Sequence, residues 1–110
     1  MKSEDALAAL GALSQQTRLT IFRRLVRVGP AGETAGVIAE ALDTPAPTLS
    51  FHLKELERAG LIVQRRESRS LIYAVHIERM RELLSFLMKD CCGGRPEICD
   101  LTIKDRCDAA

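Results

Sequence analysis

Four cysteines lie close together near the C-terminal end of the chain, at Cys91, Cys92, Cys99 and Cys107. Their thiolates are soft ligands that select thiophilic ions, and arsenite, which has a lone pair, is satisfied by three sulfurs in a pyramid. Glycines and a proline between Cys92 and Cys99 allow the intervening loop to fold back toward the adjacent pair. Adjacent cysteines suit zinc poorly, because zinc usually takes thiolate pairs about two to four residues apart. The pattern therefore predicts a site for a trivalent ion such as As(III) or Sb(III).

The same cysteines allow two other interpretations. A redox switch would use reversible disulfides, and Cys92 could pair with Cys99 easily, whereas a bond between the adjacent Cys91 and Cys92 would be strained. The thiols could also be incidental features of a flexible tail. A thiol-dependent reductase is disfavoured, because the chain has no Cys-x-x-Cys sequence and its two histidines are far from the cysteines. We therefore expect no catalytic residues and no permanent cofactor.

The composition is that of a folded protein with a single domain. The chain has 110 residues, of which 46% are hydrophobic and 28% are charged. No apolar run reaches the roughly 18 residues that a membrane span needs, and the first residues do not have the pattern of a signal peptide. These features predict a cytoplasmic protein without a membrane partner. We expect the domain at residues 1–89 and a cysteine-rich tail at residues 90–110.

Two periodicities organise the domain. Helical spacing of apolar residues predicts five helices, at residues 4–13, 15–28, 34–42, 47 or 48 to 59, and 77–89. Pro45 and Pro47 require a turn before the fourth helix, and Gly60 is its expected end. Two β-rich runs within residues 61–75 flank a polar tip and predict a hairpin. The pattern is typical of a mainly α-helical fold in which a helix-turn-helix is followed by a β-hairpin wing.

The first two helices carry recognisable caps and stripes. Ser3 and Ser14 are the expected N-caps of these helices. The apolar stripe of the first helix consists of Leu7, Leu10 and Leu13, and that of the second consists of Leu19, Phe22, Leu25 and Val26.

Two stretches of the chain resemble the ArsR/SmtB family of metal-responsive repressors. They are ALSQQTRLTIFRRL at residues 12–25 and TLSFHLKELERAGLI at residues 48–62, and the likeness covers about residues 4–89. The resemblance implies a winged helix-turn-helix that forms a homodimer through its first and last helices. It also implies repression that an inducer relieves.

The resemblance also implies which residues bind the inducer ion. In these residues the chain departs from the commonest patterns of the family. Residues 37–45 contain no cysteine before the recognition helix, and His76 stands alone near the last helix, where zinc sensors of the family have paired ligands. The chain looks like the subgroup whose arsenite site follows the last helix. That likeness implies Cys91, Cys92 and Cys99 as ligands, with Cys107 as a spare.

A DNA-reading surface is expected at the start of the fourth helix and on the wing. The net charge is only +1, but basic residues outnumber acidic ones between Lys54 and Arg81. The second helix of a helix-turn-helix presents its first residues to base edges in the major groove, and basic side chains of a wing can reach the neighbouring backbone. The expected contacts are Pro47, Thr48, Ser50, Phe51, His52 and Lys54 on the helix, with Arg65, Arg66 and Arg69 on the wing.

A homodimer would place two such helices one DNA turn apart, about 34–36 Å, and would read an inverted repeat in double-stranded operator DNA. The alternative is a protein-interaction module that uses the same fold without binding DNA.

Overall fold

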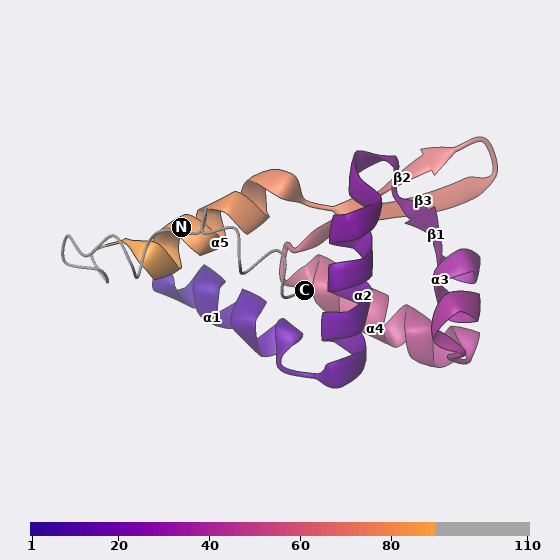
Figure 1. Cartoon of the computed structure of the whole chain (residues 1–110), viewed down its shortest axis with the longest axis horizontal. Helices are drawn as coiled ribbons and strands as arrows, with labels where there is room; N and C mark the ends of the chain where they lie inside the picture. The colour runs from indigo at the N-terminus through magenta and orange to yellow at the C-terminus, as the bar shows by residue number, and fades with distance from the viewer. Residues whose placement is uncertain (90–110) are drawn as a thin grey trace, which may run out of the picture.

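The structure, a computed structural model, describes residues 1–89 and contains five helices, one 3-10 turn and three strands. In chain order these are α1 (Ser3–Leu13), α2 (Gln16–Val28), η1 (Gly29–Ala31), β1 (Glu33–Thr34), α3 (Ala35–Leu42), α4 (Ala46–Arg58), β2 (Ile62–Glu67), β3 (Ser70–Val75) and α5 (Ile77–Met88). Figure 1 shows α1 and α5 side by side at one end of the molecule and the β2–β3 hairpin extending from the other. The predicted winged helix-turn-helix is confirmed.

The wing belongs to a three-stranded antiparallel sheet of order β1-β3-β2. The hairpin was predicted, but β1 was not: Glu33 pairs with Tyr73 and Thr34 with Ile72. The predicted third helix began at Thr34, which instead ends this strand and caps α3 by accepting a hydrogen bond from the N–H of Val37 at 3.2 Å. A two-residue strand has too few residues to show a period of two, so nothing local marked it.

Helix α1 buries a different face from the expected one, and α2 buries Phe22 and Leu25 from its expected stripe but not the other two residues. Helix α1 buries Ala6, Ala9 and Ala12, while Leu7 is 69% exposed. Helix α2 buries Ile21, Phe22 and Leu25, while Leu19 and Val26 are 42% and 39% exposed. Small alanines let α1 approach its neighbours closely, so Leu7 and Leu10 remain exposed and only Leu13 packs partly against the core. Helix α1 therefore leaves apolar side chains exposed on its surface.

Both expected caps are wrong by one residue. Lys2 precedes α1, with Ser3 already inside the helix. Gln15 caps α2, because its Oε1 accepts a hydrogen bond from the N–H of Arg18 at 2.8 Å, whereas Ser14 ends α1. A glutamine is an unusual N-cap, so serine was the better choice from sequence alone.

Two arginines fasten the sheet to the helices. Arg24 on α2 binds both carboxylate oxygens of Glu33 on β1, with Nε–Oε1 at 2.6 Å and Nη2–Oε2 at 2.9 Å. This hydrogen-bonded carboxylate raises the pKa of Arg24 above its ordinary value. Arg65 on β2 donates to the carbonyl oxygens of Pro30 and Ala31 at 3.0 and 2.8 Å. The sheet is therefore joined to α2 through β1 and to η1 through β2.

Replacing Gly32 with alanine should destabilise the fold more than the same change at Gly29. Both glycines have positive φ, 69° and 82°, and a side chain there costs about 1–3 kcal/mol. A Cβ on Gly32 would also lie 2.5 Å from the backbone oxygen of Tyr73, whereas one on Gly29 would meet nothing within 4 Å. The clash should add about 1–3 kcal/mol, measured as the difference in free energy of unfolding between the two variants. Equal losses would show that the β1–β3 contact is not as close as described.

No helix within residues 1–89 is long and apolar enough to cross a membrane.

Candidate nucleic-acid interface

The turn between α3 and α4 sets the direction of the fourth helix. Asp43 adopts a left-handed conformation, with φ 52° and ψ 48°, which aspartate tolerates better than most residues. The next N–H, of Thr44, donates to the carbonyl of Ala39 at 3.0 Å and closes the end of α3. Helix α4 begins at Ala46, one residue before the earliest predicted start, because Pro47 at its second position lacks an N–H that would have had no partner in the helix anyway.

Helix α4 has a buried face and a polar face that point in opposite directions. Leu49, Leu53 and Leu56 are no more than 1% exposed and form part of the core. Phe51, in contrast, is 57% exposed. The other expected reading residues on this exposed face are Pro47, Thr48, Ser50 and Lys54. The structure therefore places these five side chains where they can meet a ligand.

His52 is buried and does not belong to that exposed face, so its expected contact with DNA stays a prediction. It is 8% exposed, and its Nδ1 lies 3.2 Å from Nη1 of Arg18. Burial lowers the pKa of His52, and the positive charge of Arg18 lowers it further. The residue was expected near the DNA because it lies close to the start of the recognition helix, but each step along a helix is a rotation of about 100°, which takes His52 off the face that carries Phe51.

The three arginines of the wing differ in what they can do. Arg65 uses its guanidinium within the fold: besides the two carbonyls of η1, it binds Glu67 at 2.6 Å. It therefore helps to hold the wing in place, while its expected contact with DNA stays a prediction. Arg66, the next residue, points to the opposite face of β2, as successive residues in a strand must. Arg69 lies in the two-residue turn of the hairpin, after Ser68 with its φ of 58°.

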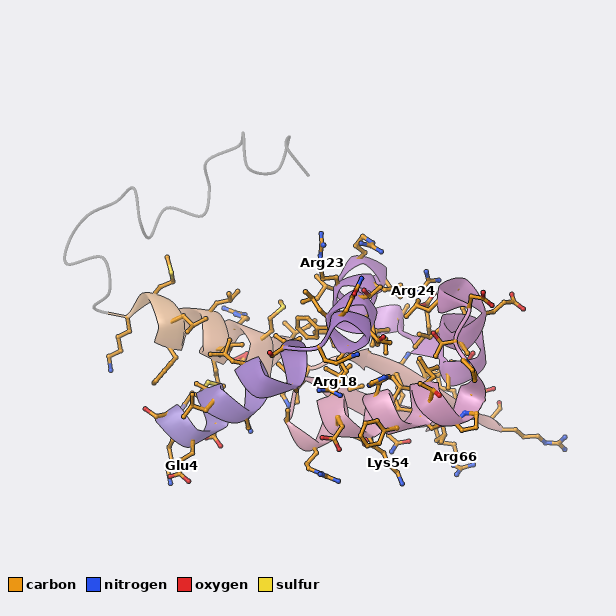
Figure 2. The ribbon with its side chains drawn as sticks, turned by 90° about the horizontal axis from the view of Figure 1, so that it is seen from below. Glu4, Arg18, Arg23, Arg24, Lys54 and Arg66 are labelled. Carbon is orange, nitrogen blue, oxygen red and sulfur yellow. The ribbon has the colours of Figure 1, made fainter. Side chains whose placement is uncertain are left out.

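Three cations remain available on this side of the molecule. Within residues 1–89, no hydrogen-bond or ion-pair partner is found for Lys54, Arg66 or Arg69. Figure 2 shows the side chains of Lys54 and Arg66 extending from one side of the protein, while Arg23 and Arg24 extend from the opposite side. By comparison, Arg58 on the last turn of α4 is partly neutralised by Glu55 at 3.3 Å. We call the exposed residues of α4 together with Arg66 and Arg69 the reading face.

Arg18 makes two contacts within the fold that no sequence pattern indicated. Its Nε donates to the carbonyl oxygen of Ala12 at 2.7 Å, in addition to its contact with His52. The partners lie 6 and 34 residues away in sequence, so no local pattern could have revealed the second of them.

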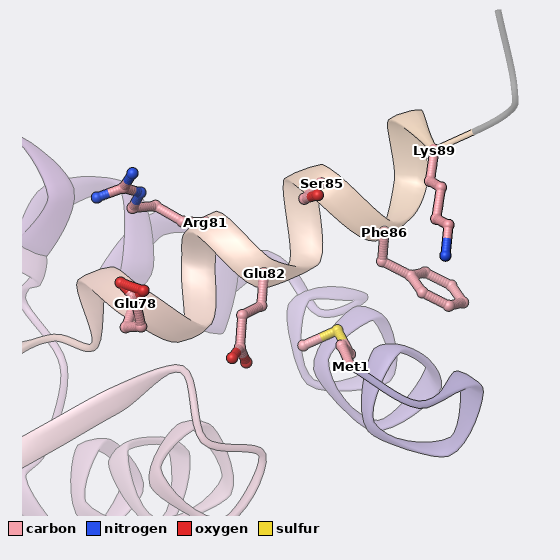
Figure 3. Close-up of a pocket in the computed structure, with 7 residues that line it drawn as sticks. All are labelled: Met1, Glu78, Arg81, Glu82, Ser85, Phe86 and Lys89. Carbon is pink, nitrogen blue, oxygen red and sulfur yellow. The ribbon is translucent and has the colours of Figure 1, made fainter.

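The predicted ion ligands Cys91, Cys92, Cys99 and Cys107 lie outside the described residues, as does the predicted tail. Within residues 1–89, no group of three or more His, Cys, Asp or Glu side chains could hold a metal ion. Figure 3 shows a cavity of about 650 Å³ beside α5, lined by Met1, Glu78, Arg81, Glu82, Ser85, Phe86 and Lys89. Its lining offers no thiolate, so we do not assign an ion to it.

Comparison with known proteins supports a DNA-binding role. Residues 13–65 match a family described as a helix-turn-helix domain. The chain is 30% identical over 86 residues to an uncharacterized HTH-type transcriptional regulator of Methanocaldococcus jannaschii, an alignment that covers 78% of this chain and 94% of that protein.

Solved structures share the fold. HlyU from Vibrio cholerae superposes with a TM-score of 0.62 at 28% identity, covering 80% of this chain and 98% of that one. An ArsR-like transcriptional regulator from Rhodococcus has a TM-score of 0.70 at 22% identity, with 94% and 92% coverage. The homodimeric winged helix-turn-helix DNA-binding domain of a possible ArsR-family regulator from Mycobacterium bovis has a TM-score of 0.63 at 24% identity, with 80% and 82% coverage.

Proposed function

The chain belongs to the helix-turn-helix family of DNA-binding transcriptional regulators, of the ArsR/HlyU type, and from this premise we propose that it is an arsenite-responsive repressor. In this proposal a homodimer binds an inverted-repeat operator through its reading faces and leaves it when As(III) or Sb(III) binds Cys91, Cys92 and Cys99. Regulators of this kind are not enzymes.

The observation that carries the DNA-binding part is the composition of the reading face. Hydroxyl groups of Thr48 and Ser50 can hydrogen-bond bases or phosphates, and the exposed ring of Phe51 can contact a thymine methyl. Lys54, Arg66 and Arg69 are cations without partners in the described part of the fold, so each can neutralise a phosphate without first breaking an ion pair. The ring of Phe51 is 57% exposed, so it is available to a partner outside the described fold.

Exposed leucines on α1 and α5 support a homodimer. Leu7 and Leu10 on α1 are 69% and 39% exposed, and Leu84 and Leu87 on α5 are 44% and 41% exposed. Figure 1 shows these two helices adjacent at the end of the molecule remote from the wing. A contiguous apolar surface of this kind commonly marks a protein interface. We call these four leucines the leucine surface. The homodimeric state of the Mycobacterium bovis domain is in keeping with this assignment.

The arsenite part of the proposal rests on ligand chemistry. Every cysteine of the chain follows α5, so a thiolate site must be built from residues 91–107. Three thiolates suit As(III), and the acidic and basic side chains of the domain do not. Helix α5 ends at Met88, two residues before the segment that holds the cysteines begins. A change in that segment on binding an ion would therefore act directly on a helix of the leucine surface.

Release requires that the ion bind the DNA-incompetent state more tightly than the DNA-bound state. A coupling free energy of about 1–3 kcal/mol would lower operator affinity about 5- to 150-fold. That range sets the size of the effect to look for.

Substituting the cysteines one at a time should identify the inducer ligands. The full-length protein would be bound to the duplex that it selects from a random DNA library, and release would be followed by fluorescence anisotropy during titration with arsenite. We expect Cys91→Ser, Cys92→Ser and Cys99→Ser to abolish release, while Cys107→Ser, the matched control, retains it. Undiminished release in all four variants would contradict the proposal.

A thiol-redox repressor that uses the same cysteines is the second candidate, favoured by their concentration in one segment. It predicts release by peroxide that a reductant such as dithiothreitol reverses, with no response to arsenite in reducing buffer.

A further inference from the structure

Arg18 joins three helices through one side chain. From α2 it donates through Nε to the carbonyl of Ala12 at 2.7 Å and lies with Nη1 3.2 Å from Nδ1 of His52 on α4. The carbonyl of Ala12 belongs to the last turn of α1, where helix carbonyls have no partner inside the helix and attract cations. Within residues 1–89, every other arginine with a hydrogen-bond or ion-pair partner contacts a carboxylate. Arg18 contacts none, so its role is geometric.

The contact with Arg18 requires a neutral His52 ring whose Nδ1 carries no proton. A guanidinium can only donate hydrogen bonds, so Nδ1 of His52 must be an acceptor and the ring is neutral, with its proton on Nε2. The charged groups that face this ring in the described part of the chain are Arg18 from α2 and Glu55 from its own helix. Burial lowers the pKa of His52, Arg18 lowers it further, and Glu55 opposes the shift. At neutral pH the ring therefore stays in the form that Arg18 requires.

His52 in turn supports the exposed aromatic ring of the reading face. The rings of Phe51 and His52 meet edge to face, with centroids 5.5 Å apart and an angle of 65° between their planes. Phe51 is 57% exposed, so this contact holds a side chain that solvent otherwise surrounds. The orientation of one ring thus depends on the orientation of the other.

We infer that Arg18 is a positioning residue for DNA recognition, which orients Phe51 through His52 and ties that ring to the end of α1. The inference rests on the proposed reading face. It adds a route for regulation, because α1 also carries half of the leucine surface. A displacement of α1 at that surface must either move Arg18 or break its bond to Ala12, and both change the support of Phe51.

The test measures sequence discrimination, the ratio of the affinity for the selected duplex to that for a scrambled duplex, with full-length protein. Arg18→Lys keeps the charge but cannot reproduce the two-donor geometry. It should reduce discrimination about tenfold, the scale of one lost base contact, with little change in affinity for the scrambled duplex. In a Phe51→Ala background, Arg18→Lys should cause no further loss, because the ring that it positions is absent. Arg23→Lys is the matched control, since Arg23 is exposed on the same helix, and it should change nothing.

A pH profile gives a second readout in proteins that retain Arg18. Protonation of His52 removes the acceptor of Arg18 and sets two positive charges against each other. Wild-type discrimination should therefore be complete above the ordinary histidine pKa of about 6.5 and should fall only as the pH drops below it, because burial and then the charge of Arg18 lower the folded-state pKa of His52. In Phe51→Ala the profile should be flat.

Three results would overturn the inference in distinguishable ways. Equal losses from Arg18→Lys with and without Phe51 would show that Arg18 acts elsewhere, leaving the reading face intact. A flat wild-type pH profile would show that His52 does not transmit the effect. Unchanged discrimination in Phe51→Ala alone would remove both the positioning role and the place of Phe51 in the reading face.

Discussion

A Leu84→Glu substitution should convert the protein to a monomer and lower its affinity for the selected operator duplex by about 10²- to 10⁴-fold. Leu84 is 44% exposed on α5, within the leucine surface. In a dimer the added carboxylate would be buried beside its copy, where an unpaired charge is strongly unfavourable. Two linked reading faces bind two half-sites about 10²- to 10⁴-fold more tightly than one reading face binds one half-site. A monomer would lose this gain in affinity. Sedimentation equilibrium and fluorescence anisotropy measure the two effects.

Val26→Glu provides the matched control for this prediction. Val26 is 39% exposed, close to the value for Leu84, but it lies on α2. This variant should remain dimeric and keep its affinity for the operator. Leu84→Glu itself should keep the affinity of one protomer for a single half-site. If Leu84→Glu remained a dimer with full operator affinity, α5 would not be part of the interface.

Removing the three cations of the reading face should weaken the salt dependence of DNA binding. The slope of log K against log salt concentration should become less steep by about 5. The variant combines Lys54→Ala, Arg66→Ala and Arg69→Ala. Each cation that neutralises a phosphate contributes about 0.9 to this slope through counterion release, and a dimer would lose six such contacts. The affinity for every sequence should fall, because phosphate contacts carry no sequence information. Titration with a fluorescent duplex between 50 and 200 mM salt, a range of about fourfold, measures the slope.

Single variants locate the effect. Arg23→Ala removes an equally exposed cation from the opposite side of the molecule (Figure 2) and should leave the slope unchanged. Arg65→Ala should lower stability and leave the slope unchanged, because Arg65 is held by Glu67 and the carbonyls of η1. Ser50→Ala should mainly relax the choice of sequence. A full slope in the triple variant would exclude the reading face.

Features that depend on neighbouring residues could be predicted from the sequence. The leucines at positions 49, 53 and 56 define the buried face of α4, and helical geometry then requires Phe51 and Lys54 to be on the outside. The prolines at positions 45 and 47 required the turn, and the β-rich runs on either side of Ser68 indicated the hairpin. The proposed inducer site also rests on the sequence alone, because its basis is the type and spacing of the cysteines.

Features that depend on distant partners were decided only by the tertiary structure. Arg65 and Arg66 are the same residue type, yet Arg65 binds carbonyls 34 and 35 residues away, whereas Arg66 has no hydrogen-bond or ion-pair partner within residues 1–89. The contact between His52 and Arg18 joins residues 34 positions apart, and β1 exists only because β3 lies beside it. Alanines rather than leucines face inward on α1 because other helices approach it there. Periodicity indicates which residues share a face of a helix. Contacts that form only when remote segments pack together determine which face is buried and which cation already has a partner within the fold.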